Sequence, residues 1–399
     1  MHSRSETFVS PVSPFNQMAV DLRLEPSTQR SGRRERRNPC ARGSSYVAVP
    51  NDTIAADLAQ PLSQARFPVL LEKASSAEGI MNRIGSRCLS VLVLLAAGTL
   101  AACKCNSGNR PTGTIEKKYY AAGPWAPITV SAGVYCCDSQ NHKFDLYYPT
   151  NLGANGFLHP IITWGNGTAG KASNVAYFLN HLASWGFVII ATEDAFTGSG
   201  QTILDAANFL VQANSDSSSV FYRKLNTSQI GAVGASQGAG GAANALIKSA
   251  GTIKTAIPIE LPAHMWCTLG PDCLDTHNLT SGSVFFIDGS SDILISPPNQ
   301  PPGVTGLESI EAYYNAVPAG VPKLKGTLIC PNHNDITGQP DCLTAMPPCV
   351  NGVYGYLGYP TAWLMDRLQG DTYAHGAFVN GTGEIFSETR NWEYVASNI

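Results

Sequence analysis

The segment QIGAVGASQG, residues 229–238, decides the fold, because it joins a short apolar run to a helix through a tight turn. Residues 239–250, which follow, are mostly small and have apolar positions at helical spacing. Ser236 is the middle residue of a G-x-S-x-G pattern, in which the two glycines let the backbone turn sharply. We therefore predict a strand, a nucleophile elbow and a helix, with the Ser236 hydroxyl projecting from the edge of a sheet.

Apolar segments and segments of helical periodicity alternate on both sides of this turn. The expected strands are residues 143–149, 159–164, 187–191, 228–233, 255–260, 283–288 and 324–330. The expected helices are residues 173–185, 202–213, 239–250, 308–316 and 360–368. This alternation predicts an α/β fold, with a mainly parallel central sheet and helices on both faces. Functional residues in such sheets gather at the carboxyl ends of the strands.

A serine nucleophile needs a base that takes its proton and an acid that orients the base. Two carboxylates follow the predicted strand 283–288: Asp288 at its end and Asp292 in the loop beyond Gly289. A side chain in the loop can reach across to a histidine, which favours Asp292 as the acid. Asp288 is the alternative, and it could instead organise the loop.

Two histidines follow Asp292 in the chain, His333 and His375. His333 comes directly after the predicted strand 324–330, where a short loop can carry it to the sheet edge. His375 lies beyond the last predicted helix and is expected to be a surface or packing residue. The order serine, acid, histidine along the chain predicts His333 as the base.

The oxyanion of an acyl-transfer transition state needs hydrogen-bond donors. One expected donor is the backbone N–H of Gln237, which begins the helix after the nucleophile. The second is expected in the glycine-containing loop 165–168, where Asn166 N–H is the first candidate and Gly167 N–H the next. A simple strand-to-helix turn is the alternative interpretation of this loop.

An apolar run that follows a short basic start dominates residues 81–103. It begins after Arg87, is too short to span a bilayer, and predicts a secretory signal peptide over residues 81–102. Its end, Leu100-Ala101-Ala102-Cys103, resembles the lipobox of bacterial lipoproteins, which implies a lipid anchor on Cys103. An ordinary cleaved signal or a buried helix remains the alternative. By resemblance to lipoprotein sorting rules, Lys104 after the cysteine favours the outer membrane of a bacterial envelope.

The residues on either side of this signal have less pattern. Residues 1–80 are rich in Ser, Pro and Arg and are expected to be a disordered or mis-assigned extension. Residues 103–125 are expected to tether the domain to its anchor, and residues 126–399 to form one hydrolase domain. The chain after Ala102 contains 14 basic and 21 acidic residues. This acidic balance argues against nucleic acid as a partner.

Eight cysteines follow Cys103, which in an exported chain predicts disulfides. The expected local pairs are Cys267 with Cys273, and one drawn from Cys330, Cys342 and Cys349. Zinc binding near Cys330 is the alternative, but the chain has no C-x-x-C pair. We expect no metal and no organic cofactor.

The region from Lys143 to Ala377 resembles α/β-hydrolases of the cutinase-like polyester hydrolase and dienelactone hydrolase group. The resemblance includes the Gly165-Asn166 loop, residues 219–226 before the elbow strand, residues 292–297, residues 332–333 and the helix 361–370. It implies Ser236 as nucleophile, His333 as base and Asp292 as orienting acid. It also implies backbone amides of Asn166 and Gln237 as the oxyanion hole.

The residues next to the nucleophile depart from that group. Polyester hydrolases often have Trp or His before the serine and Met after it, whereas this chain has Ala235 and Gln237. An aromatic wall is therefore missing there, although Trp164, Phe196 and Trp266 could line the cleft or pack in the core. The segments 265–273 and 338–349 resemble insertions that could shape the entrance.

Together these features predict a lipid-anchored serine hydrolase that cleaves carboxylic esters through an acyl-enzyme. The expected partners are a small or polymeric ester and, through the anchor, a membrane. An amidase or peptidase with the same three residues is one alternative. A hydrolase-fold binding protein without catalysis is the other.

Overall fold

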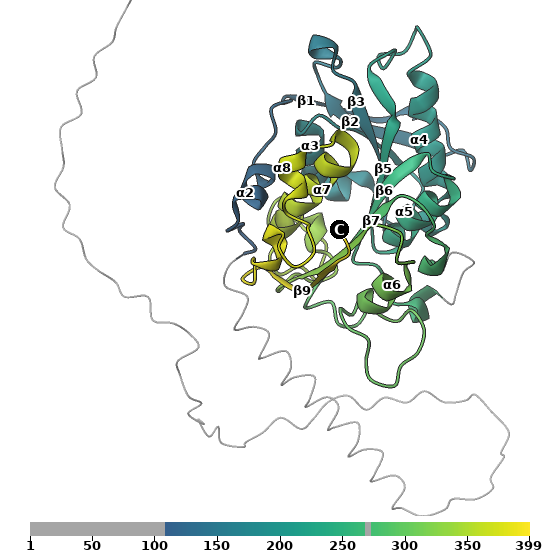
Figure 1. Cartoon of the computed structure of the whole chain (residues 1–399). Helices are drawn as coiled ribbons and strands as arrows, with labels where there is room; N and C mark the ends of the chain where they lie inside the picture. The colour runs from purple at the N-terminus through teal and green to yellow at the C-terminus, as the bar shows by residue number, and fades with distance from the viewer. Residues whose placement is uncertain (1–107, 268–272) are drawn as a thin grey trace, which may run out of the picture. The chain divides into compact units, whose positions relative to one another are not determined.

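The computed structural model describes residues 108–267 and 273–399 (Figure 1). The predicted extension 1–80, the signal peptide 81–102 and Cys103 lie outside the described residues. The described part of the chain forms an α/β domain.

One nine-stranded sheet has the strand order β1-β2-β4-β3-β5-β6-β7-β8-β9. The strands are β1 (Ile128–Cys136), β2 (Lys143–Pro149), β3 (His159–Gly165), β4 (Val188–Thr192), β5 (Leu225–Ala235), β6 (Ile253–Ile259), β7 (Ser283–Gly289), β8 (Lys323–Leu328) and β9 (Trp392–Ser397). Every pair from β4 to β8 is parallel, while β1, β2 and β9 join the sheet antiparallel. The predicted mainly parallel sheet is confirmed.

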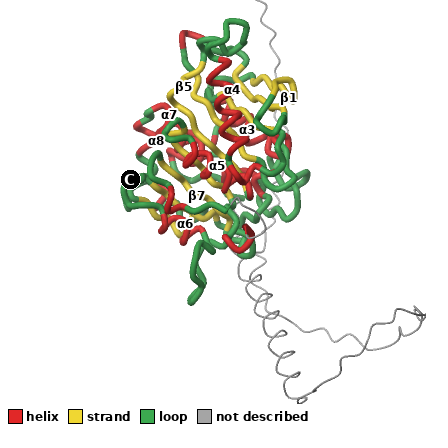
Figure 2. Tube along the Cα trace, turned by 90° about the vertical axis from the view of Figure 1, so that its right-hand side faces the viewer, coloured by secondary structure: helices red, strands yellow, loops and turns green. Residues whose placement is uncertain are grey.

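Helices cover both faces of this sheet. They are α2 (Thr114–Tyr120), α3 (Ala176–Ser184), α4 (Gln201–Ala213), α5 (Gln237–Lys248), α6 (Ile310–Ala316), α7 (Gly358–Gln369) and α8 (Thr372–His375), with short 3-10 turns between them. Figure 1 shows α2, α3, α7 and α8 on one side of the strands and α4, α5 and α6 on the other. Figure 2 shows the strands in the interior and the C-terminus at the surface.

Two apolar cores follow from this layering. One core contains Phe178 of α3 and Trp363 of α7, together with buried residues of the sheet such as Ile257 of β6. The other contains Leu210 of α4 and Leu246 of α5, on the opposite face of the sheet. Central strands such as β3 and β7 are buried along their whole length, because helices cover both of their faces. This buried framework fixes the carboxyl ends of the central strands.

The predicted tether 103–125 is corrected in its described part. Helix α2 packs against α7, and its side chains Ile115 and Tyr119 are buried in the first core. These residues are four apart and therefore lie on one helix face. Glu384 accepts hydrogen bonds from the backbone N–H groups of Thr114, Ile115 and Glu116, which caps the helix. The domain therefore begins before the predicted boundary at residue 126.

Both edge strands of the sheet were absent from the predicted elements. β1 alternates between half-buried and exposed positions, and within residues 108–267 and 273–399 it pairs only with β2. β9 pairs with β8 after the chain returns from α8. Each edge strand has one pairing partner and a partly exposed face, so its sequence lacks the continuous apolar run that marked the central strands.

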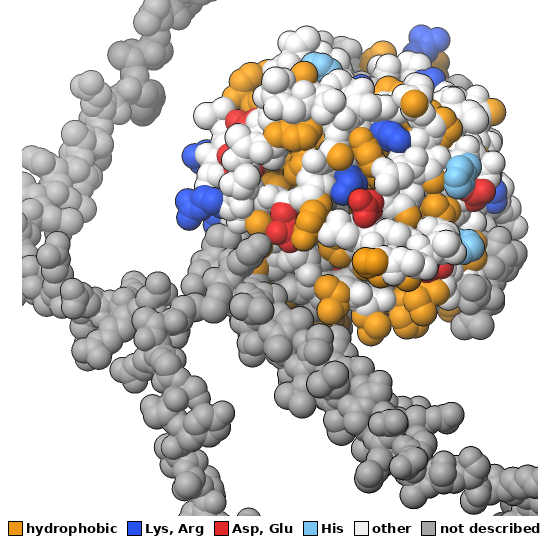
Figure 3. All heavy atoms as spheres, turned by 60° about the horizontal axis from the view of Figure 1, so that its bottom comes forward, with side chains coloured by type: hydrophobic (Ala, Val, Ile, Leu, Met, Phe, Trp, Pro, Cys, Tyr) orange, Lys and Arg blue, Asp and Glu red, His pale blue; other side chains and the backbone are white. Residues whose placement is uncertain are grey.

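The surface of the domain mixes charge types. The face shown in Figure 3 has acidic and basic side chains placed singly or side by side, among polar and apolar ones. Among the described residues, no helix combines the length and the apolar character needed to cross a bilayer.

Candidate active site

Ser236 lies in a strained turn between β5 and α5. Its φ of 55° is unusual for a residue with a side chain, and it is the N-cap of α5. A Cβ on Gly234 would lie 2.1 Å from the carbonyl oxygen of Gly238, and a Cβ on Gly238 would lie 2.2 Å from that of Gly165. Both glycines are therefore required by close backbone contact, which explains the G-x-S-x-G spacing.

Three side chains that are distant in sequence form a hydrogen-bonded chain at this edge. The Nε2 atom of His333 lies 2.8 Å from Ser236 Oγ, and its Nδ1 atom lies 2.5 Å from Asp292 Oδ2. Asp292 and His333 are buried, with 3% and 8% of their surface exposed, while Ser236 is half-buried. With the Nδ1 proton directed at Asp292, Nε2 is free to accept the serine proton.

The two alternative residues lie elsewhere. Asp288 is fully buried, and its Oδ1 accepts a hydrogen bond from Thr327 on the neighbouring strand β8 at 2.8 Å. Burial raises the pKa of Asp288 to about 8. His375 is hydrogen-bonded to Asp366 through Nδ1 at 3.3 Å, at the end of α8. The structure brings together Asp292 and His333, and it places neither alternative in the chain of hydrogen bonds.

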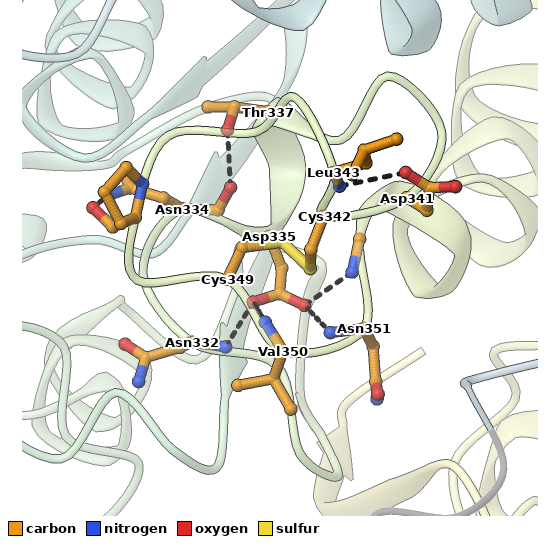
Figure 4. The surroundings of a disulfide bond; sticks show 12 residues. Asn332, Asn334, Asp335, Thr337, Asp341, Cys342, Leu343, Cys349, Val350 and Asn351 are labelled. Carbon is orange, nitrogen blue, oxygen red and sulfur yellow. Dashed lines mark hydrogen bonds between the residues drawn. A yellow bond between two sulfur atoms is a disulfide. The ribbon is translucent and has the colours of Figure 1, made fainter.

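The loop that carries His333 is held by a carboxylate that the sequence analysis did not single out. Buried Asp335 accepts hydrogen bonds from four backbone N–H groups (Figure 4). The donors are Asn332 at 2.9 Å, Val350 at 2.8 Å, Asn351 at 2.5 Å and Gly352 at 2.8 Å. Burial raises the pKa of Asp335, and these hydrogen bonds oppose that effect. Its four donors tie the histidine loop to the segment 350–352.

A disulfide closes the chain between these two points. Cys342 and Cys349 are bonded, with their Cα atoms 5.5 Å apart, beside the Asp335 carboxylate (Figure 4). A pair drawn from the last three cysteines is thereby confirmed. Cys136 and Cys137 also form a disulfide. The expected pairing of Cys267 with Cys273 was wrong: within the described part of the chain no disulfide joins these two residues.

The predicted oxyanion loop follows β3 and faces the serine. The buried side chain of Asn166 donates to the carbonyl oxygens of Thr192 at 2.7 Å and Asp194 at 2.9 Å. It also accepts from Trp164 Nε1 at 3.1 Å, so it anchors the loop. A Cβ on Gly167 would lie 3.3 Å from Ser236 Cβ and 4.0 Å from its Oγ. Gly167, the second candidate donor, therefore lies against the nucleophile.

A cavity of about 570 Å³ opens at Ser236. Apolar walls come from Trp164, Ala235, Trp266 and Met346, the last from the disulfide-closed loop. Of the three aromatic residues considered, Trp164 is buried and Trp266 half exposed, while Phe196 is exposed at 60%. Both predicted insertions therefore contribute to the entrance, through Trp266 and Met346.

Polar side chains also line this cavity, among them Lys171, Asn174 and Asn334. Gln237 lines it too, and its Oε1 atom has no hydrogen-bond partner within the described part of the chain. The cavity thus offers a mainly apolar space beside the serine and a few polar groups.

Among the described residues, two groups of side chains have donor atoms close enough to hold a metal ion. In the first, Asp335 lies beside Cys342 and Cys349, whose sulfur atoms are bonded to one another. In the second, Glu260 lies beside Asp292 and His333, which are hydrogen-bonded to each other. Both sets of donors are engaged in other bonds. Cys330, beside which zinc was considered, is disulfide-bonded.

Three contributors to this site were missed from the sequence. Asp335 was missed although it lies two residues after the predicted base, and Met346 lies within a segment recognised only as an insertion. Glu260 ends a predicted strand and carries no motif. A usable signal for Asp335 was its Asn-His-Asn-Asp context, since Asp commonly accepts backbone N–H groups in loops.

Comparison with known families agrees with this geometry. Residues 109–267 match the family model described as PET hydrolase-like, which supports ester hydrolysis at the level of the family. The match covers the oxyanion loop and Ser236 but ends before Asp292 and His333. A search of curated proteins found no match. Residues 109–267 are therefore a PET hydrolase-like region of an α/β-hydrolase fold, and the predicted resemblance to the polyester hydrolase group is confirmed.

Proposed function

We propose that this protein is a serine esterase that cleaves carboxylic esters through an acyl-enzyme on Ser236. The observation that carries the proposal is the continuous hydrogen-bonded chain from Ser236 through His333 to Asp292, at 2.8 and 2.5 Å. The serine end of this series of hydrogen bonds opens into a mainly apolar cavity. Ser236 itself lies in a strained turn, as the nucleophile of an α/β-hydrolase does. The family match supports the ester as the class of substrate.

The chemistry follows from the positions of the groups. His333 Nε2 accepts the proton of Ser236 as Oγ attacks the ester carbonyl, and Asp292 stabilises the imidazolium that forms. The imidazolium then gives its proton to the leaving alkoxide. Water, deprotonated by His333 in turn, attacks the acyl-enzyme and releases the acid and the serine hydroxyl.

Two backbone donors face the developing oxyanion in this proposal. The first is Gln237 N–H, at the positive N-terminal end of α5. The second comes from the Asn166–Gly167 loop, and the closeness of Gly167 to Ser236 supports the glycine as the donor. The Asn166 side chain then holds the loop in place.

The test uses a fluorophosphonate probe and p-nitrophenyl esters from acetate to palmitate, on the wild type and on Ser236→Ala. We expect labelling and hydrolysis by the wild type and neither by the variant. Equal hydrolysis by both proteins would exclude Ser236 as the nucleophile. An unlabelled, inactive wild type would favour a non-catalytic binding protein, and faster cleavage of matched amides than esters would favour an amidase.

We further propose that the chain is exported and lipid-anchored to a bacterial outer membrane through Cys103. The signal-like run before Cys103 supports this, as does the Cys342–Cys349 disulfide, since disulfides persist in oxidising compartments. Metabolic labelling with a fatty-acid analogue should mark the wild type and be lost in Cys103→Ala. Label that persists in the variant would refute the anchor.

A further inference from the structure

Glu260 lies at the centre of the site without a role in the chemistry described so far. It directly follows β6, which lies between β5 and β7 in the sheet. The backbone around it is engaged on both sides. Ser236 N–H donates to the Ile259 carbonyl oxygen at 2.9 Å, and Glu260 N–H donates to that of Ile287 at 2.8 Å. Glu260 thus joins the nucleophile elbow to the strand that leads to Asp292.

The backbone of Glu260 is strained. Its φ of 50° lies in the left-handed region, which residues with a long side chain rarely adopt. Such strain persists where the surroundings enforce it, and it is concentrated at functional sites. Here it directs the glutamate side chain into the domain, where none of its surface is exposed.

The buried carboxyl group contacts the loop that carries the acid. Glu260 Oε2 accepts a hydrogen bond from Gly289 N–H at 3.1 Å, and Oε1 shares one with the Tyr356 hydroxyl. The Gly289 carbonyl oxygen in turn accepts from Asp292 N–H at 2.9 Å. One oxygen of Glu260, one of Asp292 and a ring nitrogen of His333 lie within 4.8 Å of one another. Glu260 is therefore the support of the turn that presents Asp292.

The electrostatics of this pocket favour an uncharged carboxyl group. Burial, and then the charges of Asp292 and Asp288, raise the pKa of Glu260 well above its usual range. The other ionisable groups that face it are Tyr356, whose pKa is also raised by burial, and His333. A protonated carboxyl group has one carbonyl oxygen for Gly289 N–H and one hydroxyl for Tyr356, which can both donate and accept. The observed partners fit this form.

We propose that Glu260 is a positioning residue of the esterase: it fixes the Gly289 turn, and thereby holds Asp292 against His333. This inference rests on the proposed function, because it assigns a role within the same catalytic chain. The role differs from that of Asp292, since Glu260 acts through Gly289 and Tyr356 and does not touch the reacting atoms.

The test compares Glu260→Ala with Glu260→Gln, in the purified full-length protein with its disulfides intact. Alanine removes the support, so we expect kcat to fall by about 100-fold with little change in KM, as for a catalytic group displaced by about 1 Å. Glutamine offers one oxygen and one donor group, the pattern of the protonated acid. We therefore expect it to restore kcat at pH 7 to within about threefold of the wild type.

The pH profile supplies a readout that a merely structural role would not change. As pH rises, Glu260 loses its proton, and its negative charge then repels that of Asp292. This repulsion should disturb the position of Asp292, so we expect the kcat/KM of the wild type to fall on the alkaline side. The Glu260→Gln variant should lack this fall. Asp288→Asn is the matched control, because it removes a neighbouring buried carboxyl group that bonds Thr327. This control should keep the alkaline fall but move it to lower pH, since the charge of Asp288 contributes to the raised pKa of Glu260.

The outcomes separate the two proposals. A wild type that neither hydrolyses esters nor is labelled at Ser236 refutes the proposed function. An active wild type, together with a folded Glu260→Ala variant of unchanged kcat, refutes the positioning role. If Glu260→Ala does not fold, the Glu260→Gln profile decides: a profile that superimposes on that of the wild type overturns the proposal, and loss of the alkaline fall supports it.

Discussion

Replacing Gly234 by alanine should damage both the stability and the activity of the domain. The added Cβ would lie 2.1 Å from the carbonyl oxygen of Gly238, 2.5 Å from its carbonyl carbon and 3.1 Å from the carbonyl oxygen of Gly165. Ordinary contacts of this kind are longer than 3 Å, so β5 and the first turn of α5 must separate by about 1 Å. The clash is with backbone, which has no rotamer to change.

The size of both effects can be estimated from this displacement. Overpacking of this kind costs about 1–3 kcal/mol in the free energy of unfolding. For a domain of this size, each kcal/mol lowers Tm by roughly 2–4 °C. A shift of about 1 Å between Ser236 Oγ and His333 Nε2 should lower kcat by about 100-fold.

The assay pairs thermal unfolding with p-nitrophenyl ester hydrolysis, and Gly320→Ala is the control. Gly320 has no positive φ, and its added Cβ would meet nothing within 4 Å. Alanine there should be neutral or should stabilise by about 0.4–1 kcal/mol, with activity unchanged. If the Tm and the kcat of Gly234→Ala equal those of the control, close contact between backbones is not the reason for the glycine.

Two further predictions concern the loop and the N-terminal helix. Replacing Cys342 and Cys349 together by serine should lower the free energy of unfolding by about 2 kcal/mol, because the disulfide no longer restrains the unfolded chain. It should also raise KM, since Met346 of that loop lines the cavity. An unchanged Tm and an unchanged KM would contradict this prediction. Burial raises the pKa of Glu116 to about 8, so its contribution to stability is present below its unfolded-state pKa of about 4.5 and is lost as pH rises through about 8. Glu116→Gln keeps an acceptor for Trp392 Nε1 and has no proton to lose. It should match the wild type in melting at pH 4.5 but exceed it at pH 9, by up to about 4 kcal/mol; equal melts at both pH values would exclude a buried neutral Glu116.

The central strands and the order of the site residues could be predicted, because strong signals mark them. A strand covered on both faces is a continuous apolar run, and Ser236, Asp292 and His333 each follow such a run. Their chemical types are also restricted, since few residues can serve as nucleophile, acid and base. The same reasoning placed Asp288 below Asp292 as the acid, and in the structure Asp288 is bonded to Thr327 instead.

The N-terminal boundary could not be predicted for a physical reason. Helix α2 is seven residues long, too short for a periodic pattern to stand out, and it is held by tertiary contacts. Its capping carboxylate comes from Glu384, 270 positions away from Thr114. A segment stabilised by so distant a partner has the local sequence of a linker.

The Asn166 loop has a side-chain role that the sequence did not suggest. The sequence suggested the backbone N–H of Asn166 as the first oxyanion donor, with Gly167 next. In the structure the Asn166 carboxamide is used fully, with both carbonyl acceptors on the segment after β4 and the indole of Trp164 as donor. Gly167 lies close to Ser236, where an added Cβ would be 3.3 Å from Ser236 Cβ and 3.3 Å from the Ala235 carbonyl oxygen, which is a tight contact. The Asn166 side chain thus anchors the loop, and Gly167 is the residue of the loop that lies close to Ser236.

The site as a whole is a property of the sheet edge. Neighbouring parallel strands lie about 4.8 Å apart, so residues that directly follow them meet, whatever their separation in sequence. The five neighbouring strands β3, β5, β6, β7 and β8 each supply one such position: Gly167, Ser236, Glu260, Asp292 and His333. Four of these could be recognised because motif and residue type agreed. Glu260 could not, because its meaning depends on the order β5-β6-β7, which places one carboxyl group between the nucleophile and the acid. Under the proposed function, a residue at the end of β6 could therefore change the electrostatics of Asp292 and His333 without contacting the substrate.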